Sequence, residues 1–153
     1  MSEYEDRTFN GPHYTFVVLS RRDLKRFGSA EPFAAISITN PLLPEAELGP
    51  DAPCAEVLRL QFHDTGDYGQ PLRDQIVMTP AHAEQILAFV ERHRSTVRTW
   101  VCQCEAGVSR SAAVAAALSR ILQGDDRFFF ANFSPNRWVY RTLLDAHEIR
   151  PSP

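Results

Sequence analysis

Four short apolar runs are spaced along the chain, and each predicts a β-strand. They are rich in β-branched and aromatic side chains, which pack well on a pleated surface. The runs cover residues 14–19 (YTFVVL), 33–39 (FAAISIT), 56–62 (EVLRLQF) and 99–103 (TWVCQ). Residues 40–53 contain four prolines and a glycine, and residues 63–78 form a long polar stretch, so both are expected to be loops.

Helical segments are predicted from the spacing of apolar residues and from residues that favour helix ends. A short helix is expected over residues 21–27, closed by Gly28. Thr79 and Pro80 are typical of a helix start, with Thr as N-cap and Pro at the first helical position. Apolar residues then recur at helical spacing, at Ala83, Ile86, Leu87 and Val90.

Two further helices are predicted in the last third of the chain. Residues 109–122 are rich in alanine and strongly favour a helix. Ser134 and Pro135 repeat the helix-start pattern, which predicts a final helix to about His147. Strands that alternate with helices predict a single α/β domain, with a central, mainly parallel sheet of about four to five strands flanked by helices.

The same pattern sets the expected limits of the domain. It is predicted to span residues 13–148, between a flexible N-terminal arm over residues 1–12 and a tail over residues 149–153. Sheets of this kind carry their binding sites at the carboxyl ends of the strands. The turn between the strand ending near Gln103 and the helix starting near Ser109 is therefore the first candidate for a site.

Composition and charge narrow the classes of function. The 153 residues fit one domain, and a formal net charge of -3 argues against a nucleic-acid partner. No apolar run is long enough to span a bilayer, and the N-terminus lacks the apolar region of a signal peptide. We therefore expect a cytoplasmic protein without a membrane partner. The sequence does not indicate the oligomeric state.

The turn after Gln103 reads Cys-Glu-Ala-Gly-Val-Ser-Arg-Ser over residues 104–111. Backbone N–H groups at a helix N-terminus lack partners and lie at the positive end of the helix dipole, so a loop curled there forms a phosphate site. Gly107 permits backbone torsions that a side chain forbids. Ala106 and Val108 are expected to pack beneath the loop.

Three side chains of this turn suit chemistry on a phosphate. The N–H groups and Arg110 favour the thiolate form of Cys104, which is a strong nucleophile. The planar fork of Arg110 can bind two phosphate oxygens and hold the extra charge of the transition state. The hydroxyl of Ser111 is placed to hydrogen-bond the thiolate and to stabilise it when it leaves.

These residues closely resemble the Cys-x5-Arg-Ser/Thr signature of the protein tyrosine and dual-specificity phosphatase superfamily, as a compact bacterial-type member. The resemblance is specific over residues 101–117 and extends in outline from residue 14 to residue 147. It implies a phosphate-monoester hydrolase that works through a phosphocysteine intermediate, with no metal and no cofactor. Cys104 maps onto the nucleophile, Arg110 onto the phosphate clamp and Ser111 onto the hydroxyl that aids thiolate release. The implied phosphate-binding N–H groups belong to Glu105, Ala106, Gly107, Val108, Ser109 and Arg110.

One position departs from the family pattern. The family usually has a histidine just before the nucleophile, and this chain has Gln103. A glutamine can donate a hydrogen bond but carries no charge. We therefore expect a thiol that ionises less readily than in typical relatives.

The leaving oxygen needs a proton, so a carboxylic acid is expected across the pocket. In the resembling family this acid is an aspartate from a loop upstream of the nucleophile, which favours Asp64. The loop is longer than in small dual-specificity members, and it also contains Asp67, the main alternative, and Asp74. Residues 65–77 of this loop are a candidate lid.

Other residues have plainer interpretations. Cys102 is expected to be a buried core residue, and Cys54 is a remote candidate for a redox partner. His63 is interpreted as a surface or supporting residue, and residues 128–130 (FFF) as core packing. Asn136 and Arg137 fit a pocket rim and a helix cap equally well.

The expected substrate is a phosphorylated protein or a small aryl phosphate, because the turn contains Glu105 and no lysine. Whether phosphotyrosine or phosphoserine is preferred depends on the depth of the pocket. One alternative function is a non-catalytic phosphate-binding pseudophosphatase or interaction module, which Gln103 and the open choice of acid suggest. A second alternative is sulfur transfer or arsenate reduction through a similar loop.

Overall fold

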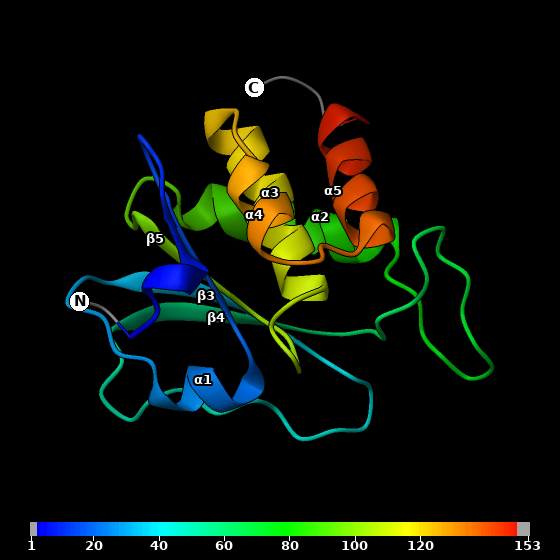
Figure 1. Cartoon of the computed structure of the whole chain (residues 1–153), viewed down its shortest axis with the longest axis horizontal. Helices are drawn as coiled ribbons and strands as arrows, with labels where there is room; N and C mark the ends of the chain where they lie inside the picture. Colours follow the sequence, from blue (N-terminus) through cyan, green and yellow to red (C-terminus); the bar gives the residue numbers. More distant parts are fainter. Residues whose placement is uncertain (1–2, 150–153) are drawn as a thin grey trace.

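Five strands form one sheet in the order β1-β2-β5-β3-β4 (Figure 1). The structure, a computed structural model, describes residues 3–149. Strands β2, β5, β3 and β4 run parallel, and β1 pairs antiparallel with β2. The prediction of a mainly parallel α/β sheet is therefore confirmed. The strands are β1 (Thr8–Asn10), β2 (Thr15–Leu19), β3 (Phe33–Thr39), β4 (Cys54–Gln61) and β5 (Thr99–Gln103).

Helices cover both faces of the sheet, and this explains why β2, β3 and β5 are buried along their whole length (Figure 1). The larger layer contains α2 (Pro80–His93), α3 (Arg110–Gln123), α4 (Arg127–Asn132) and α5 (Arg137–Ile149), and α1 (Arg21–Arg26) lies on the opposite face. Side chains alternate between two apolar clusters. Phe16 and Ile36 face the larger layer, whereas Val17 and Ala35 face α1. Within residues 3–149 no helix is long and apolar enough to cross a bilayer.

The amino-terminal segment corrects the expectation of a loose arm over residues 1–12. A 3-10 turn (Glu5–Arg7) leads into β1, and Phe9 of β1 pairs with Phe16 of β2. Tyr4 is buried, with its ring centroid 5.5 Å from that of Phe27. A three-residue edge strand is too short to show a pattern of its own, and its contacts with distant residues hold it in place. Residues 1–2 lie outside the described part of the chain.

The helix ends agree only in part with the sequence patterns. Thr79 caps α2 as predicted, and the ring Nδ1 of His82 accepts from the Thr79 N–H at 3.0 Å. Helix α1, in contrast, ends without the expected glycine cap, because Phe27 closes it in an extended conformation. The tail is predicted over residues 149–153, and residues 150–153 of it lie outside the described part of the chain.

The last helix starts later than predicted. Ser134 does not cap it: its backbone N–H donates to the carbonyl of Val108 at 3.0 Å, which ties it to another loop. The cap is Asn136, whose side-chain oxygen accepts from the Val139 N–H at 3.0 Å. Helix α5 therefore begins at Arg137.

Candidate active site

The turn after β5 directs its carbonyl groups into the protein. The carbonyl of Glu105 accepts from the Arg21 N–H at 3.2 Å, and that of Val108 from the Ser134 N–H at 3.0 Å. The carbonyl of Gly107 accepts from the guanidinium of Arg7 at 2.9 Å. In residues 3–149, none of the N–H groups of residues 105–110 donates to a protein acceptor. These N–H groups, at the N-terminus of the 14-residue helix α3, are thus available to an anion. We call residues 104–110 the phosphate loop.

Gly107 allows the loop to lie against the end of β2. Its φ is +70°, in the left-handed region that favours glycine. A Cβ at this position would lie 2.5 Å from the backbone nitrogen of Ser20 and 2.6 Å from the carbonyl carbon of Leu19. Because that backbone fills the underside of the loop, Ala106 and Val108 do not pack beneath it. Both are exposed, which corrects the sequence-based expectation.

Cys104 and Ser111 lie together at the base of the loop. The Sγ atom of Cys104 is 3.1 Å from the Oγ atom of Ser111, and both residues are buried. The Cys104 N–H donates to the carbonyl of Leu19 at 3.2 Å, which anchors the residue to β2. A hydroxyl at this distance can donate a hydrogen bond to a thiolate.

Arg110 is buried, and its guanidinium is hydrogen-bonded to the protein through Nη1. Its Nη1 donates to the side-chain oxygen of Asn40 and to the carbonyl of Phe62, both at 2.7 Å. Its Nε is buried and has no acceptor within the described part of the chain. A buried donor without a partner costs free energy unless a ligand satisfies it. The guanidinium of this loop residue therefore offers a buried, unused donor.

Gln103 forms a neutral hydrogen-bonded chain behind the cysteine. Its side-chain nitrogen donates to the carbonyl of Cys104 at 3.0 Å, and its side-chain oxygen accepts from the hydroxyl of Ser37 on β3. Gln103 and Ser37 are both buried. Sequence analysis missed Ser37, because its role depends on the β3–β5 pairing that places it opposite Gln103.

Asp64 is the candidate acid that the structure joins to the phosphate loop. Its Oδ1 accepts from the hydroxyl of Ser109 at 2.9 Å and from the side-chain amide of Asn136 at 2.8 Å. Asp67 instead accepts from the backbone N–H of Arg137 at 3.2 Å, at the start of α5. Ser109 therefore serves Asp64 with its side chain, although it also stands at the N-cap position of α3.

Solved structures with the same architecture place these features in a known context. Human DUSP28 superposes with a TM-score of 0.56 at 22% sequence identity, over 92% of this chain and 92% of that chain. A mouse protein described as a dual specificity phosphatase, complexed with zinc tungstate, gives a TM-score of 0.57 at 21% identity, over 97% of this chain and 91% of its own. The chain has the fold of the dual-specificity phosphatases.

The phosphatase fold also occurs in a third similar structure, a human tyrosine phosphatase-like serine/threonine/tyrosine-interacting protein. It gives a TM-score of 0.53 at 18% identity, over 78% of each chain. No protein-family model matches the sequence, and no curated protein matches it either. At these identities the comparison establishes the fold, and the chemistry is argued from this chain's own residues.

Asn136 connects the three segments that meet at the site of this phosphatase fold. Its side-chain amide donates to Asp64 and to the carbonyl of Thr65 at 2.6 Å, and its backbone N–H donates to the carbonyl of Ser109 at 3.1 Å. Only 4% of the residue is exposed. Of the two roles considered from the sequence, the helix cap is confirmed, and the side chain also holds Asp64.

An ion pair ties the phosphate loop to the opposite face of the sheet. The carboxylate of Glu105 accepts from Nε and Nη2 of Arg21, each at 2.9 Å, and these hydrogen bonds raise the pKa of Arg21. Nη2 of Arg21 also donates to the carbonyl of Pro44 at 2.6 Å. Because the pair is bidentate, it orients the loop as well as neutralising Glu105.

The other two cysteines lie on strands, Cys102 on β5 and Cys54 on β4. All three cysteines are free. Cys102 is fully buried, as expected for a core residue, and burial raises the pKa of its thiol. Cys54 begins β4, and partial burial raises its pKa as well. Within residues 3–149 no three His, Cys, Asp or Glu side chains cluster in a way that could hold a metal ion.

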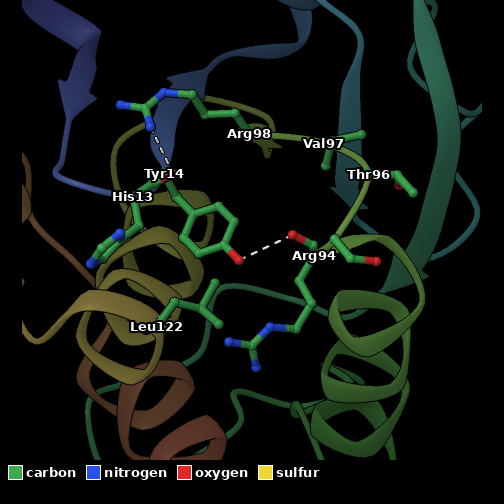
Figure 2. Close-up of a pocket in the computed structure, with 8 residues that line it drawn as sticks. His13, Tyr14, Arg94, Thr96, Val97, Arg98 and Leu122 are labelled. Carbon is green, nitrogen blue, oxygen red and sulfur yellow. Dashed lines mark hydrogen bonds between the residues drawn. The ribbon is translucent and has the colours of Figure 1, made fainter.

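A separate hollow of about 710 Å³ lies at the amino ends of β2 and β5, away from the phosphate loop (Figure 2). Two of its polar side chains donate hydrogen bonds to backbone carbonyls. Arg98 donates to the carbonyls of His13 and Gly11, both at 2.9 Å, and the hydroxyl of Tyr14 donates to the carbonyl of Arg94 at 3.0 Å. Among the described residues, its lining includes Ser95 and Thr96 but no cysteine, and it is formed by no set of free N–H groups like that of the phosphate loop, so the phosphate loop is the better candidate for an active site.

Proposed function

We propose that the protein hydrolyses phosphate monoesters by the cysteine-dependent mechanism of protein tyrosine and dual-specificity phosphatases. One observation carries the proposal. The N–H groups of residues 105–110 and the buried Nε of Arg110 have no protein acceptor in the described chain, and the buried thiol of Cys104 begins the same loop. Such a set of unused donors in one loop with a thiol suits a tetrahedral dianion. The tungstate in the mouse neighbour is also a tetrahedral oxyanion.

The first chemical step forms a bond between Sγ of Cys104 and phosphorus and breaks the bond from phosphorus to the leaving oxygen. The donors of the phosphate loop and Arg110 stabilise the negative charge of the transition state. Asp64 protonates the leaving oxygen. Its two hydrogen-bond donors both contact Oδ1, which leaves Oδ2 to carry the proton.

The second step returns the enzyme to its starting state. Asp64, now ionised, takes a proton from a water molecule, and the water oxygen bonds to phosphorus. The phosphorus–sulfur bond breaks, and the sulfur leaves as a thiolate. Ser111, whose Oγ is 3.1 Å from the sulfur, donates a hydrogen bond that stabilises this leaving group.

The test is hydrolysis of p-nitrophenyl phosphate by the wild type and by Cys104→Ser. We expect turnover by the wild type, no turnover by the variant and competitive inhibition by vanadate. Rapid quenching should trap a phosphate on Cys104 alone, with Cys102 and Cys54 as internal controls. Undiminished turnover by Cys104→Ser would refute the mechanism.

A second candidate function is a phosphate-binding module without efficient turnover. It is favoured by the neutral Gln103 at the position of the usual histidine, and by the similarity to a phosphatase-like interacting protein. In that case wild-type protein would bind a phosphopeptide but release no phosphate from any aryl phosphate. Persulfide and arsenate assays with the same protein separate the sulfur-transfer and arsenate-reduction alternatives.

A further inference from the structure

Large apolar side chains are exposed mainly in the phosphate loop and in the two loops that are hydrogen-bonded to it, residues 40–53 and 63–78. Within residues 3–149, the other large exposed apolar residue is Ile149, at the far end of α5. Isolated exposed apolar residues are normal, but a group around one site marks a contact surface. We call this group the apolar rim: Leu42, Leu43, Tyr68, Leu72, Ile76 and Val108.

The first part of the rim is fixed beside the phosphate loop at two points. Asn40 accepts from Arg110, and the carbonyl of Pro44 accepts from Arg21, which pairs with Glu105. Leu42 and Leu43 lie between these two anchors in the chain. They cannot lie far from the phosphate loop, because each is at most two residues from an anchor.

The second part of the rim lies on the long loop after β4. His63 and Ile76 are joined by two hydrogen bonds of 2.8 Å, so the intervening loop leaves and re-enters the fold at one place. This loop extends from the body of the molecule beyond the end of β4 (Figure 1). Asp64 anchors its start to the phosphate loop, and the loop carries Tyr68 and Leu72.

Leu42 is displayed in a backbone conformation that does not suit leucine. The turn from Asn40 to Leu43 is closed by a hydrogen bond of 3.2 Å, and Leu42 has a φ of +73°. A turn of this type favours glycine or asparagine at that position. The Leu42 side chain is 99% exposed, so it contributes no packing in return. Unfavourable backbone conformations of this kind concentrate at ligand-contacting sites.

A hollow next to Val108 offers room for a neighbouring side chain. It encloses about 320 Å³ and is lined by Phe130, Phe133, Pro135, Arg137 and Asp67, among others. The backbone hydrogen bond from Ser134 to Val108 joins this hollow to the phosphate loop. Its lining combines the rings of Phe130 and Phe133 with the charged side chains of Asp67 and Arg137.

The charge of the two loops bears on the kind of partner. Residues 40–53 and 63–78 contain six carboxylates and one arginine. Binding to an anionic bilayer requires clustered lysines and arginines, and these loops have the opposite balance. Lys25 on neighbouring α1 is paired with Glu47, 3.2 Å away. The charges therefore favour a protein segment over a lipid surface.

We propose that the apolar rim docks a phosphorylated protein segment that carries apolar side chains on either side of its phosphorylated residue. The proposal rests on the proposed phosphatase function and adds a preference for the sequence around the phosphate. A small aryl phosphate would fill the phosphate loop without reaching the rim. The rim would therefore raise kcat/KM for suitable peptides and leave kcat/KM for p-nitrophenyl phosphate unchanged.

The test compares matched phosphopeptides that carry leucine or serine on both sides of the phosphorylated residue, with phosphotyrosine and phosphothreonine versions of each. Wild type should hydrolyse the leucine-flanked peptide with kcat/KM about tenfold higher, the effect of burying roughly one large apolar side chain. Leu42→Gly and Leu72→Ser should each remove most of this preference by raising KM for the leucine-flanked peptide. The matched control is Ile149→Ser, which removes an exposed apolar residue outside the rim.

The melting temperature of Leu42→Gly distinguishes a role of Leu42 in substrate recognition from a role in stabilising the fold. Glycine adopts a positive φ without strain, so Leu42→Gly should melt at or above the wild-type temperature. Its turnover of p-nitrophenyl phosphate should be unchanged. A lower melting temperature together with lost turnover would mean that Leu42 supports the fold, and would overturn the proposal.

The remaining outcomes distinguish the failure of the apolar-rim proposal from the failure of the proposed phosphatase function. Equal kcat/KM for both peptides, with normal turnover of p-nitrophenyl phosphate, would overturn the rim and leave the phosphatase proposal intact. Faster phosphate release from phosphatidylcholine vesicles containing a phosphatidylinositol phosphate, lost in Leu42→Gly, would assign the rim to lipid and overturn it as well. Absence of turnover on every substrate would refute the phosphatase function itself.

Discussion

The side-chain amide of Asn136 donates to Oδ1 of Asp64 at 2.8 Å. The backbone N–H of Asn136 also donates to the carbonyl of Ser109, so one buried residue fixes the candidate acid relative to the phosphate loop. A general acid contributes to rate only when its proton reaches the leaving oxygen. The position of Asp64 therefore depends on a residue 72 positions away in the chain.

Asn136→Ser is expected to lower kcat by about tenfold or more on phenyl phosphate, because the acid loses a positioning donor. Serine is also a good N-cap, so the melting temperature should change little. The loss should be smaller on p-nitrophenyl phosphate, whose leaving group needs less protonation. Ser134→Ala is the matched control, since its side chain has no part in this network. An equal loss on both substrates would contradict a role through Asp64.

Asp64→Asn should remove general-acid catalysis and lower kcat on phenyl phosphate by about 10²–10⁴-fold. Asp67→Asn should stay close to wild type, because Asp67 contacts the start of α5 rather than the phosphate loop. The measurement is the pH dependence of kcat for both variants. The fall in kcat at high pH, which reports loss of the proton from the general acid, should disappear in Asp64→Asn only. Its disappearance in Asp67→Asn would reverse the assignment.

Gly107→Ala should abolish vanadate binding and destabilise the fold, since the new Cβ would lie 2.5 Å from a backbone atom of Ser20. Overpacking of this kind costs about 1–3 kcal/mol, which corresponds to a fall of roughly 2–12 °C in melting temperature. Gly28→Ala provides the control, because Gly28 has open space around it. Normal vanadate affinity in Gly107→Ala would show that the loop has another conformation in solution.

Gln103→His should shift alkylation of Cys104 by iodoacetamide to lower pH. The glutamine amide donates to the Cys104 carbonyl without a charge, whereas an imidazolium would add a positive charge at the same place. Cys102 serves as the internal control, because burial raises the pKa of its thiol and should keep it unlabelled. The same pH profile in Gln103→His and in the wild type would refute the expected effect of Gln103.

His82 should make stability fall as the pH is lowered from 7 to 5. Burial lowers its pKa below the ordinary value of 6.5, so folding favours the neutral ring. The resulting stability is fully present above the unfolded pKa and is lost as the pH falls through the folded pKa. His82→Gln keeps an acceptor for the Thr79 N–H in the capping box and cannot titrate. The decrease in melting temperature between pH 7 and 5 should therefore be smaller in the variant, and an equal decrease would exclude His82 as a cause.

Much of the fold could be predicted from local pattern. The strand over residues 99–103 was predicted with its observed limits, and Thr79 was recognised as the cap of α2. The errors lie where distant contacts override local preference. Ser134 has a helix-start pattern, but its N–H is bound to Val108. Strand β1 has no pattern of its own and exists because β2 lies beside it.

The candidate site divides in the same way. Cys104, Gly107, Arg110 and Ser111 are close in the sequence, so a local motif was enough to predict them as one site. The choice between Asp64 and Asp67 was not local, because it depends on which carboxylate Ser109 and Asn136 reach. Ser37, Asn40 and Arg21 were likewise invisible, since they act through hydrogen bonds that only the folded chain forms.

The sequence by itself determined the chain order of the four parallel strands and of helices α1, α2, α3 and α5, and it identified the turn after β5 as the candidate site, because short-range periodicity and one contiguous motif encode both. Only the tertiary structure decided which carboxylate meets the phosphate loop and what holds Arg110 and Gln103. The reason is physical: hydrogen bonds between residues some 40–70 positions apart depend on strand register and on how the loops close, and neither is written in any local segment.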